Sequence, residues 1–113
     1  MKLAFKGRPT PDAAEAVLAF WFSELKPYQW FRRDRDADNS IRRRFAALHG
    51  AASNGRLDVL REDPRHSLAL VILLDQFSRN LFRGSPMAFA QDTHARSVAA
   101  DAVRRRVDLL YGA

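Results

Sequence analysis

The stretch LALVILLDQFSRNLFR, residues 68–83, constrains the fold more than any other part of the sequence. It opens with seven consecutive apolar residues and becomes polar from Asp75 onward. At about 3.6 residues per turn, its apolar side chains cover two faces of a helix, and only one narrow stripe stays polar. A helix that is apolar on nearly every side is packed on several sides. We therefore predict a central helix that starts at Asp63-Pro64 and ends at Gly84.

Three further helices are predicted from capping residues and from apolar residues at helical spacing. Each starts near a Ser, Thr or Asp, and prolines or glycines separate the helices. The alternation of apolar and polar residues that is typical of strands does not occur. We predict an all-α domain of antiparallel helical hairpins with four main helices. These are residues 11–25, about 37–53, the central helix, and a last helix that starts at Ser85-Pro86.

Residues 27–35 are predicted to connect the first two helices, and they contain an aromatic pair, Trp30 and Phe31. The alternating acids that follow resemble the start of a calcium-binding loop, but the glycine and glutamate that such a loop requires are absent. We therefore interpret Asp36 or Asp38 as the N-cap or a first-turn carboxylate of the next helix.

The chain has 113 residues, 47% of them hydrophobic, which is typical of one globular domain over residues 1–113. The absence of cysteine excludes disulfides and cysteine-based zinc sites. No segment approaches the roughly 20 apolar residues of a membrane span, and the N-terminus lacks the apolar core of a signal peptide. These features predict a cytoplasmic protein with no membrane partner.

The formal net charge of +6 is compatible with nucleic-acid binding, but the pattern of charges argues against it. The arginines are spread along the chain, and the two runs at residues 42–44 and 104–106 form no focused patch, because consecutive helical residues point to different sides. We predict that the charge forms a solvated surface and that nucleic acid is not a specific partner.

Asp75 and Arg79 lie one helical turn apart in an otherwise apolar sector, where an unpaired charge is costly. We expect a structural ion pair in which Asp75 is a buried polar residue. The alternative is a polar pocket around Asp75, Arg79 and Asn80 that binds a small molecule or performs catalysis.

The polar stripe of the central helix is the other candidate site, because nothing forces its residues into the core. Such a stripe on an inner helix can line a groove for a peptide or partner, although plain solvent exposure explains it equally well. The candidate groove residues are Gln76, Arg79, Asn80, Arg83, Trp30 and Phe31.

No motif identifies catalytic chemistry, a cofactor or a metal. His49, His66 and His94 show no metal-binding spacing, and no nucleophile elbow or phosphate loop is present. We assign no catalytic residues, no metal ligands and no cofactor, and we lean towards a protein that is not an enzyme.

Four further motifs follow one another along the chain: FWF (20–22), WF (30–31), LLDQFSRNLFRG (73–84) and AFAQD (88–92). Together they resemble one uncharacterised bacterial family, the domain of unknown function 924, and the resemblance covers about residues 15–102. It implies an all-α fold related to the right-handed arrays of tetratricopeptide-repeat hairpins, and no established reaction, substrate or cofactor. Family members continue with further helices, so the chain resembles the N-terminal half of the family's domain.

The resemblance leaves the cellular role unknown, and we favour a helical-hairpin scaffold or a module that binds a protein or peptide partner. The central helix has two apolar faces and three partner helices to cover them. The sequence also ends with the apolar residues Val107, Leu109, Leu110 and Tyr111. Large exposed apolar surfaces mark interfaces. We therefore predict a two-fold homodimer with the last helix in the interface.

Overall fold

The computed structural model describes residues 11–111, with all their side chains except those of Pro11, Phe31 and residues 107–111. Within this part every regular element is helical, so the predicted all-α fold is confirmed. In chain order the elements are α1 (Pro11–Ala19), a π-helical segment (Phe20–Glu24), α2 (Pro27–Phe31), α3 (Arg35–Ser53), a 3₁₀ turn (Asp58–Glu62), α4 (Pro64–Val71), a second π-helical segment (Ile72–Gln76), α5 (Phe77–Leu81), a 3₁₀ turn (Pro86–Phe89) and α6 (Asp92–Tyr111).

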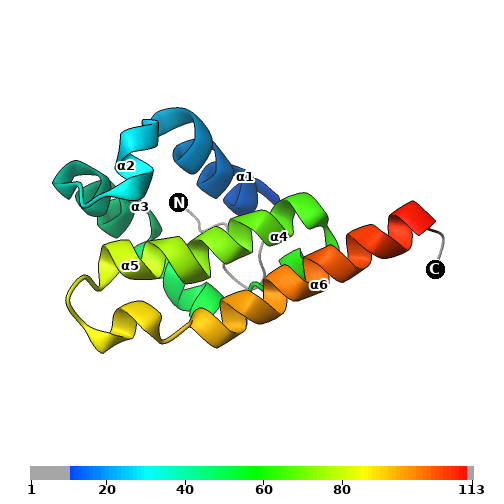
Figure 1. Cartoon of the computed structure of the whole chain (residues 1–113). Helices are drawn as coiled ribbons and strands as arrows, with labels where there is room; N and C mark the ends of the chain where they lie inside the picture. Colours follow the sequence, from blue (N-terminus) through cyan, green and yellow to red (C-terminus); the bar gives the residue numbers. More distant parts are fainter. Residues whose placement is uncertain (1–10, 112–113) are drawn as a thin grey trace.

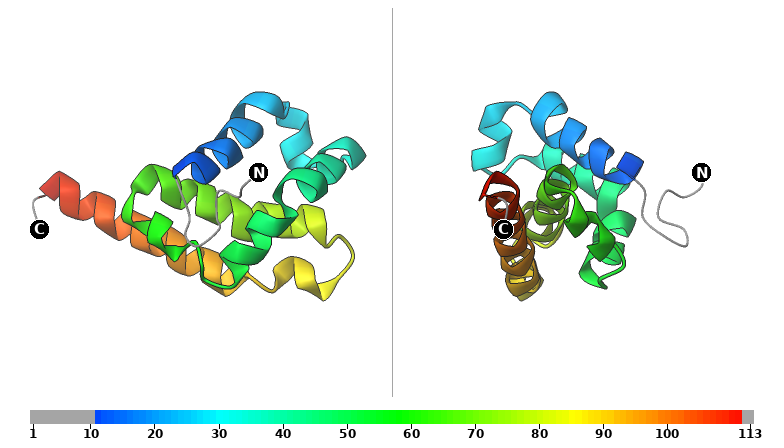
Figure 2. Two further views of the ribbon diagram at one scale, coloured as in Figure 1. Left: turned by 180° about the vertical axis from the view of Figure 1, so that it is seen from behind. Right: turned by 90° about the vertical axis from the view of Figure 1, so that its right-hand side faces the viewer.

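The predicted central helix is confirmed as the continuous rod formed by α4, the second π-helical segment and α5 (Figure 1). The side chain of Asp63 caps it by accepting hydrogen bonds from the backbone N–H groups of Arg65 and His66. Gly84 follows the helix with a φ of +80°, a left-handed conformation that favours glycine. Helix α1 packs against α4, α3 packs against α5, and α6 runs antiparallel beside α4 (Figures 1 and 2).

Phe77 lies at the centre of the core and is completely buried. Its ring centroid is 5.2 Å from that of Phe45 and 6.0 Å from those of Phe20 and Trp21. Aromatic rings from the π-helical segment after α1, from α3 and from the central helix therefore meet at one point. Aromatic contacts of this kind stabilise beyond the area that they bury. This cluster holds the three helices in a defined orientation.

Two π-helical segments interrupt the α-helical hydrogen-bonding pattern. The N–H of Leu25 donates to the carbonyl of Phe20 at 3.0 Å, and the N–H of Phe77 donates to the carbonyl of Ile72, both five residues back. A π-turn accommodates one residue more than an α-turn and shifts the side chains around the helix axis. In the central helix the consecutive residues 72–74 are all buried at this point, as expected for a helix that is packed on several sides.

Three predicted boundaries were wrong. Helix α3 starts at Arg35, because Asp34 is extended and its side chain accepts from the N–H of Ala37 at 2.9 Å, so Asp34 is the N-cap. The connector at residues 27–35 contains the short helix α2. After Ser85-Pro86 the chain makes only a 3₁₀ turn, which reverses its direction, and α6 starts at Asp92.

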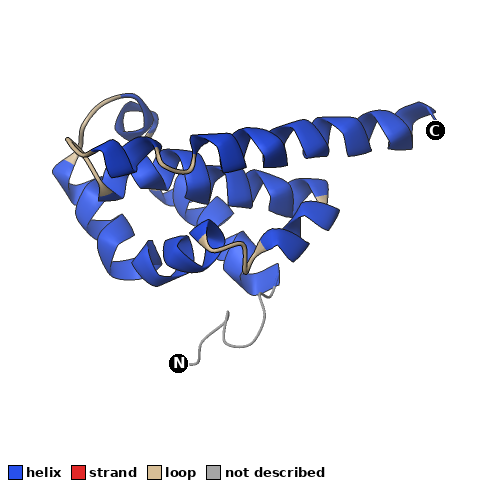
Figure 3. Ribbon diagram, turned by 90° about the horizontal axis from the view of Figure 1, so that it is seen from below, coloured by secondary structure: helices blue, strands red, loops and turns tan. Residues whose placement is uncertain are grey.

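Several large apolar side chains are half exposed, notably Leu68 on the central helix, Phe22 after α1 and Met87 before α6. The C-terminal part of α6 extends past the other helices (Figure 3). The apolar residues at 107–111 that motivated the predicted interface lie outside the described side chains.

Candidate functional site

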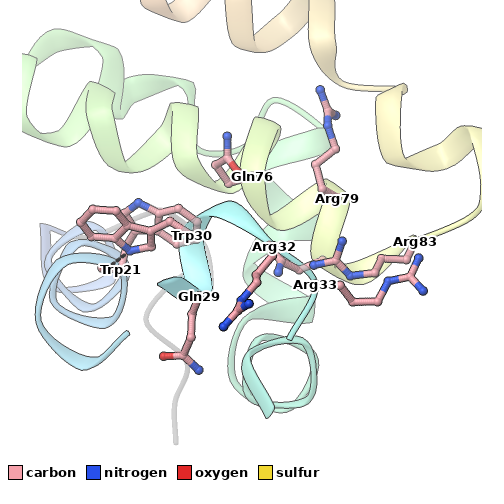
Figure 4. A pocket seen from close by; sticks show the side chains of 9 residues that line it. Trp21, Gln29, Trp30, Arg32, Arg33, Gln76, Arg79 and Arg83 are labelled. Atoms are coloured by element: carbon pink, nitrogen blue, oxygen red, sulfur yellow. Dashed lines mark hydrogen bonds between the residues drawn. The ribbon is translucent and has the colours of Figure 1, made fainter. Parts of the chain in front are cut away.

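A pocket of about 300 Å³ opens between the α2 region and the polar stripe of the central helix (Figure 4). It contains five of the six residues predicted for the groove, and the side chain of the sixth, Phe31, is outside the described part. The lining residues are Trp21, Gln29, Trp30, Arg32, Arg33, Gln76, Arg79, Asn80 and Arg83.

The pocket has an aromatic side and a cationic side. Figure 4 shows the rings of Trp21 and Trp30 opposite the guanidinium groups of Arg32, Arg33 and Arg83. None of the nine lining residues is an acid, and polar atoms dominate the exposed wall. A pocket that gathers guanidinium groups without lining carboxylates attracts anions, because each guanidinium can donate paired hydrogen bonds to a carboxylate or phosphate.

Both π-helical segments contribute to this pocket. Trp21 belongs to the segment Phe20–Glu24, and Gln76 ends the segment Ile72–Gln76. π-Turns occur frequently at functional sites, where the shifted helical register aims a side chain that an α-helix would point elsewhere. Periodicity at 3.6 residues per turn does not reveal these shifts.

The two tryptophans form a fixed wall. The indole N–H of Trp30 donates to the carbonyl of Trp21 at 2.9 Å, and the two rings are nearly parallel, with centroids 6.2 Å apart. The ring of Phe22 packs edge-on against Trp30. Because its donor is satisfied and its ring is clamped, Trp30 presents a rigid surface.

Gln29 and Asp34 hold α2 and the start of α3 together beside the pocket. The side-chain oxygen of Gln29 accepts from the N–H of Lys26 at 2.8 Å, and its amide donates to Asp34 at 3.1 Å. Hydrogen bonds from the N–H of Ala37 and then from Gln29 lower the pKa of Asp34. These contacts position the intervening Arg32 and Arg33, which project from the α2–α3 connection.

The carboxylate of Asp38 binds two residues on the cationic side of the pocket. It accepts from Arg83 at 2.6 and 3.0 Å and from the amide of Asn80 at 2.8 Å. Asp38 and Asn80 are both buried. The sequence predicted that Asp36 or Asp38 is the N-cap or a first-turn carboxylate, and Asp38 does lie in the first turn of α3. Its contacts with Arg83 and Asn80 were not predicted. A signal was present, because Asp38 shares the buried face of α3 with Ile41 and Phe45 at helical spacing.

Arg79 connects the pocket to α6. Its guanidinium donates to Asp75 at 3.2 Å, to Asp92 at 3.0 Å and to the carbonyl of Ala88, and it lies 4.5 Å from the ring centroid of Phe89. The predicted pairing of Asp75 with Arg79 is therefore confirmed. The stem of Arg79 borders the pocket while its guanidinium reaches α6 (Figure 4).

The prediction that Asp75 is buried was wrong, since 31% of its side chain is exposed. Asp75 lies beside a separate hollow with Asp92, where α6 covers the central helix only in part, and Gln76 donates to it at 2.7 Å. The alternative pocket around Asp75, Arg79 and Asn80 is not formed as one cavity. Asp75 borders one hollow, Asn80 borders the other, and only Arg79 touches both.

The histidines serve separate local contacts. The buried His49 lies 2.8 Å from the hydroxyl of Ser78, and burial lowers its pKa. His66 lies near Glu15, and His94 near Asp58. Among the side chains that the structure describes, no three from His, Asp or Glu gather in a group that could hold a metal ion.

Another hollow, of about 510 Å³, adjoins the arginine-lined pocket of about 300 Å³. The two share a wall of three arginines, Arg33, Arg79 and Arg83. Its other wall is the segment that follows the central helix, and its exposed surface is mainly apolar. That wall consists of Gly84, Ser85, Pro86, Ala88 and Phe89.

The chain matches one known protein family and one solved structure. The model of a bacterial protein family of unknown function, DUF924, matches residues 17–111. The chain belongs to this family. The solved structure of a protein of unknown function from Agrobacterium tumefaciens is 40% identical, with a TM-score of 0.80 over 88% of this chain and 56% of that one. The chain therefore spans just over half the length of that relative.

No match was found among the curated proteins compared with the chain. The family and the Agrobacterium protein have no assigned function, and the cellular role of this chain is unknown. In the described part of the chain, no helix is long and apolar enough to cross a membrane.

Proposed function

We propose that this DUF924 protein is a partner-binding module whose arginine-lined pocket receives an anionic group of the partner. One observation supports this proposal above all. Arg32, Arg33 and Arg83 line one side of a pocket of about 300 Å³ that has no acid among its nine lining residues. Charge-assisted hydrogen bonds to a guanidinium are about twice as strong as neutral ones, so a carboxylate or phosphate is the favoured occupant.

The pairing of the arginines supports the same conclusion. Arg83 is held by Asp38, so its orientation is set before a ligand arrives. Within the described residues, Arg32 and Arg33 have no ion pair with an acid; Arg32 lies 5.4 Å from the ring centroid of Tyr28. The charge of Arg32 also helps to lower the pKa of the neighbouring Asp34. Among the arginines that line the pocket, Arg33 is therefore the best placed to pair with an incoming anion.

The test is a titration with a short acidic peptide at low ionic strength, followed through the fluorescence of the pocket tryptophans. Inorganic phosphate and succinate serve as small-anion probes. Arg33→Gln is expected to weaken peptide binding about tenfold, which is the effect of removing one charge-assisted hydrogen-bonding partner. Binding should also weaken as salt is added.

Arg42→Gln is the matched control. It removes the same charge from an exposed residue of α3 that bonds to Asn39 and does not line the pocket. The proposal is refuted if none of the three probes saturates a fluorescence signal, or if Arg42→Gln weakens binding as much as Arg33→Gln does.

We further propose that the helices belong to a right-handed array like that of tetratricopeptide-repeat hairpins, that the protein acts in the cytoplasm, and that it forms a two-fold homodimer through α6. The antiparallel pair of the central helix and α6 supports the helical array. The extension of α6 past the other helices supports the homodimer (Figure 3). We do not favour nucleic acid as a specific partner, because four arginines line one pocket, whereas nucleic-acid binding typically uses an extended basic face.

A further inference from the structure

We propose that the partner is recognised through two side chains of an extended peptide, an acidic one at the arginine wall and a large apolar one in the adjoining hollow. This inference rests on the proposed function, because the acidic side chain is the anionic group described above. It adds the second subsite and the chemistry of the partner segment.

The adjoining hollow has the properties of an apolar subsite. Its volume is about 510 Å³, its surface is mainly apolar, and Phe89, which is 60% exposed, lies on its wall. A large aromatic side chain exposed to this extent beside a concavity gains free energy when an apolar group covers it.

The wall is ordered rather than adaptable. Ser85 caps the 3₁₀ turn by accepting from the N–H of Met87 at 3.1 Å, and Pro86 restricts the backbone at the next position. Arg79 fixes the end of the turn through the carbonyl of Ala88 and through its contact with the Phe89 ring. A preformed wall reduces the entropy that binding must overcome.

Arg33, Arg79 and Arg83 border both hollows, so one ligand can contact both at once. In an extended peptide, side chains two positions apart point to the same side and are separated by about 7 Å. An acid in the first position would therefore reach the arginines while an apolar side chain two residues away enters the second hollow.

Both hollows lie open to solvent on the surface, and the first has mainly polar walls. Sites for small molecules enclose most of the ligand and are mainly apolar. An open groove with a polar and an apolar subsite on either side of a cationic wall favours a peptide segment over a small free anion.

The experiment compares three peptides, blocked at both ends and free of tryptophan, by calorimetry and by tryptophan fluorescence. The first contains Glu-Ser-Phe, the second Glu-Ser-Ser and the third Gln-Ser-Phe, in the same serine-rich context. We expect the first peptide to bind at least about tenfold more tightly than the second, as the burial of one phenylalanine side chain predicts. The third should bind more weakly than the first because it lacks the charge.

Phe89→Ser is expected to remove the advantage of the first peptide over the second. Phe89→Leu should retain most of that advantage, because an apolar wall remains. Met87→Ser is the matched control, since Met87 is 52% exposed on the same turn and does not line the hollow. Circular dichroism checks that each variant is folded.

The outcomes separate this inference from the proposed function. If neither acidic peptide binds, the proposed function fails and this inference fails with it. If both bind equally well, or if Phe89→Leu loses as much of the advantage as Phe89→Ser, the anion pocket stands and the apolar subsite is refuted. Phenylpropionate binding as tightly as the first peptide would refute a peptide ligand in favour of a small amphipathic acid.

Discussion

Replacement of Asp38 by alanine tests whether the buried carboxylate holds the cationic side of the pocket to α3. The change removes the acceptor of three hydrogen bonds, two from Arg83 and one from Asn80. Asn80 is buried at the edge of the pocket, so its amide would lose its partner with little access to water, which costs about 1–3 kcal/mol.

Arg83 contributes less to this loss, because 29% of its side chain is exposed and its guanidinium can turn towards water. Loss of this partly screened pair adds about 1 kcal/mol. The expected decrease in the free energy of unfolding is thus about 2–4 kcal/mol. For a chain of this length, it corresponds to a fall in melting temperature of about 8–16 °C.

The assay is urea unfolding followed by far-ultraviolet circular dichroism, with thermal unfolding in parallel. Asp36→Ala is the control, because Asp36 occupies the same first turn of α3 and is exposed. It removes the same favourable interaction with the helix dipole, worth about 0.3–1 kcal/mol, without touching the network. If the two variants lose the same stability, the Asp38 network does not stabilise the fold and the reasoning is refuted.

Three further predictions concern other parts of the molecule. Because burial lowers the pKa of His49, the unfolded chain binds a proton at this residue below about pH 6.5, whereas the folded chain binds it only at lower pH. Stability should therefore fall as pH decreases from about 6.5 towards the folded pKa, by at most about 1.4 kcal/mol per pH unit. In urea unfolding, the stability of His49→Asn should depend less on pH in that range. Equal slopes for the variant and the unmodified protein would contradict the role given to His49. Phe77→Ala should lower the free energy of unfolding in urea by about 3–5 kcal/mol, because it empties the centre of the aromatic cluster. Asp75→Ala should lower it by about 1 kcal/mol or less, because the ion pair is partly exposed. A smaller loss for Phe77→Ala than for Asp75→Ala would contradict the described core. Light scattering at micromolar concentration should give twice the monomer mass of 12.9 kDa, and a stable monomer would refute the proposed homodimer.

Much of the fold could be predicted from the sequence because helix boundaries and amphipathic faces depend on neighbouring residues. Asp63-Pro64 and Gly84 marked the central helix correctly, and the apolar run between them indicated burial on several sides. The polar stripe was identified in the same way, since residues four apart share a helical face. Its residues do border a pocket with Trp30.

The sequence could not predict which distant residues complete that pocket. Arg32 and Arg33 had no distinguishing local pattern, and they reach the pocket only because Gln29 and Asp34 fold α2 back towards α3. The exposure of Asp75 was also misjudged, because it depends on where α6 crosses the central helix rather than on the helix to which Asp75 belongs.

Capping, spacing and composition thus determined the helical fold, the central helix and the face that carries the site. Tertiary packing alone decided that Asp38 meets Asn80 and Arg83, residues 42 and 45 positions away, and that two π-turns aim Trp21 and Gln76 into one pocket. The physical reason is the distance along the sequence over which each kind of interaction acts. Backbone hydrogen bonds and side-chain periodicity act within one or two helical turns, whereas charge pairing across helices depends on packing angles that the whole core sets.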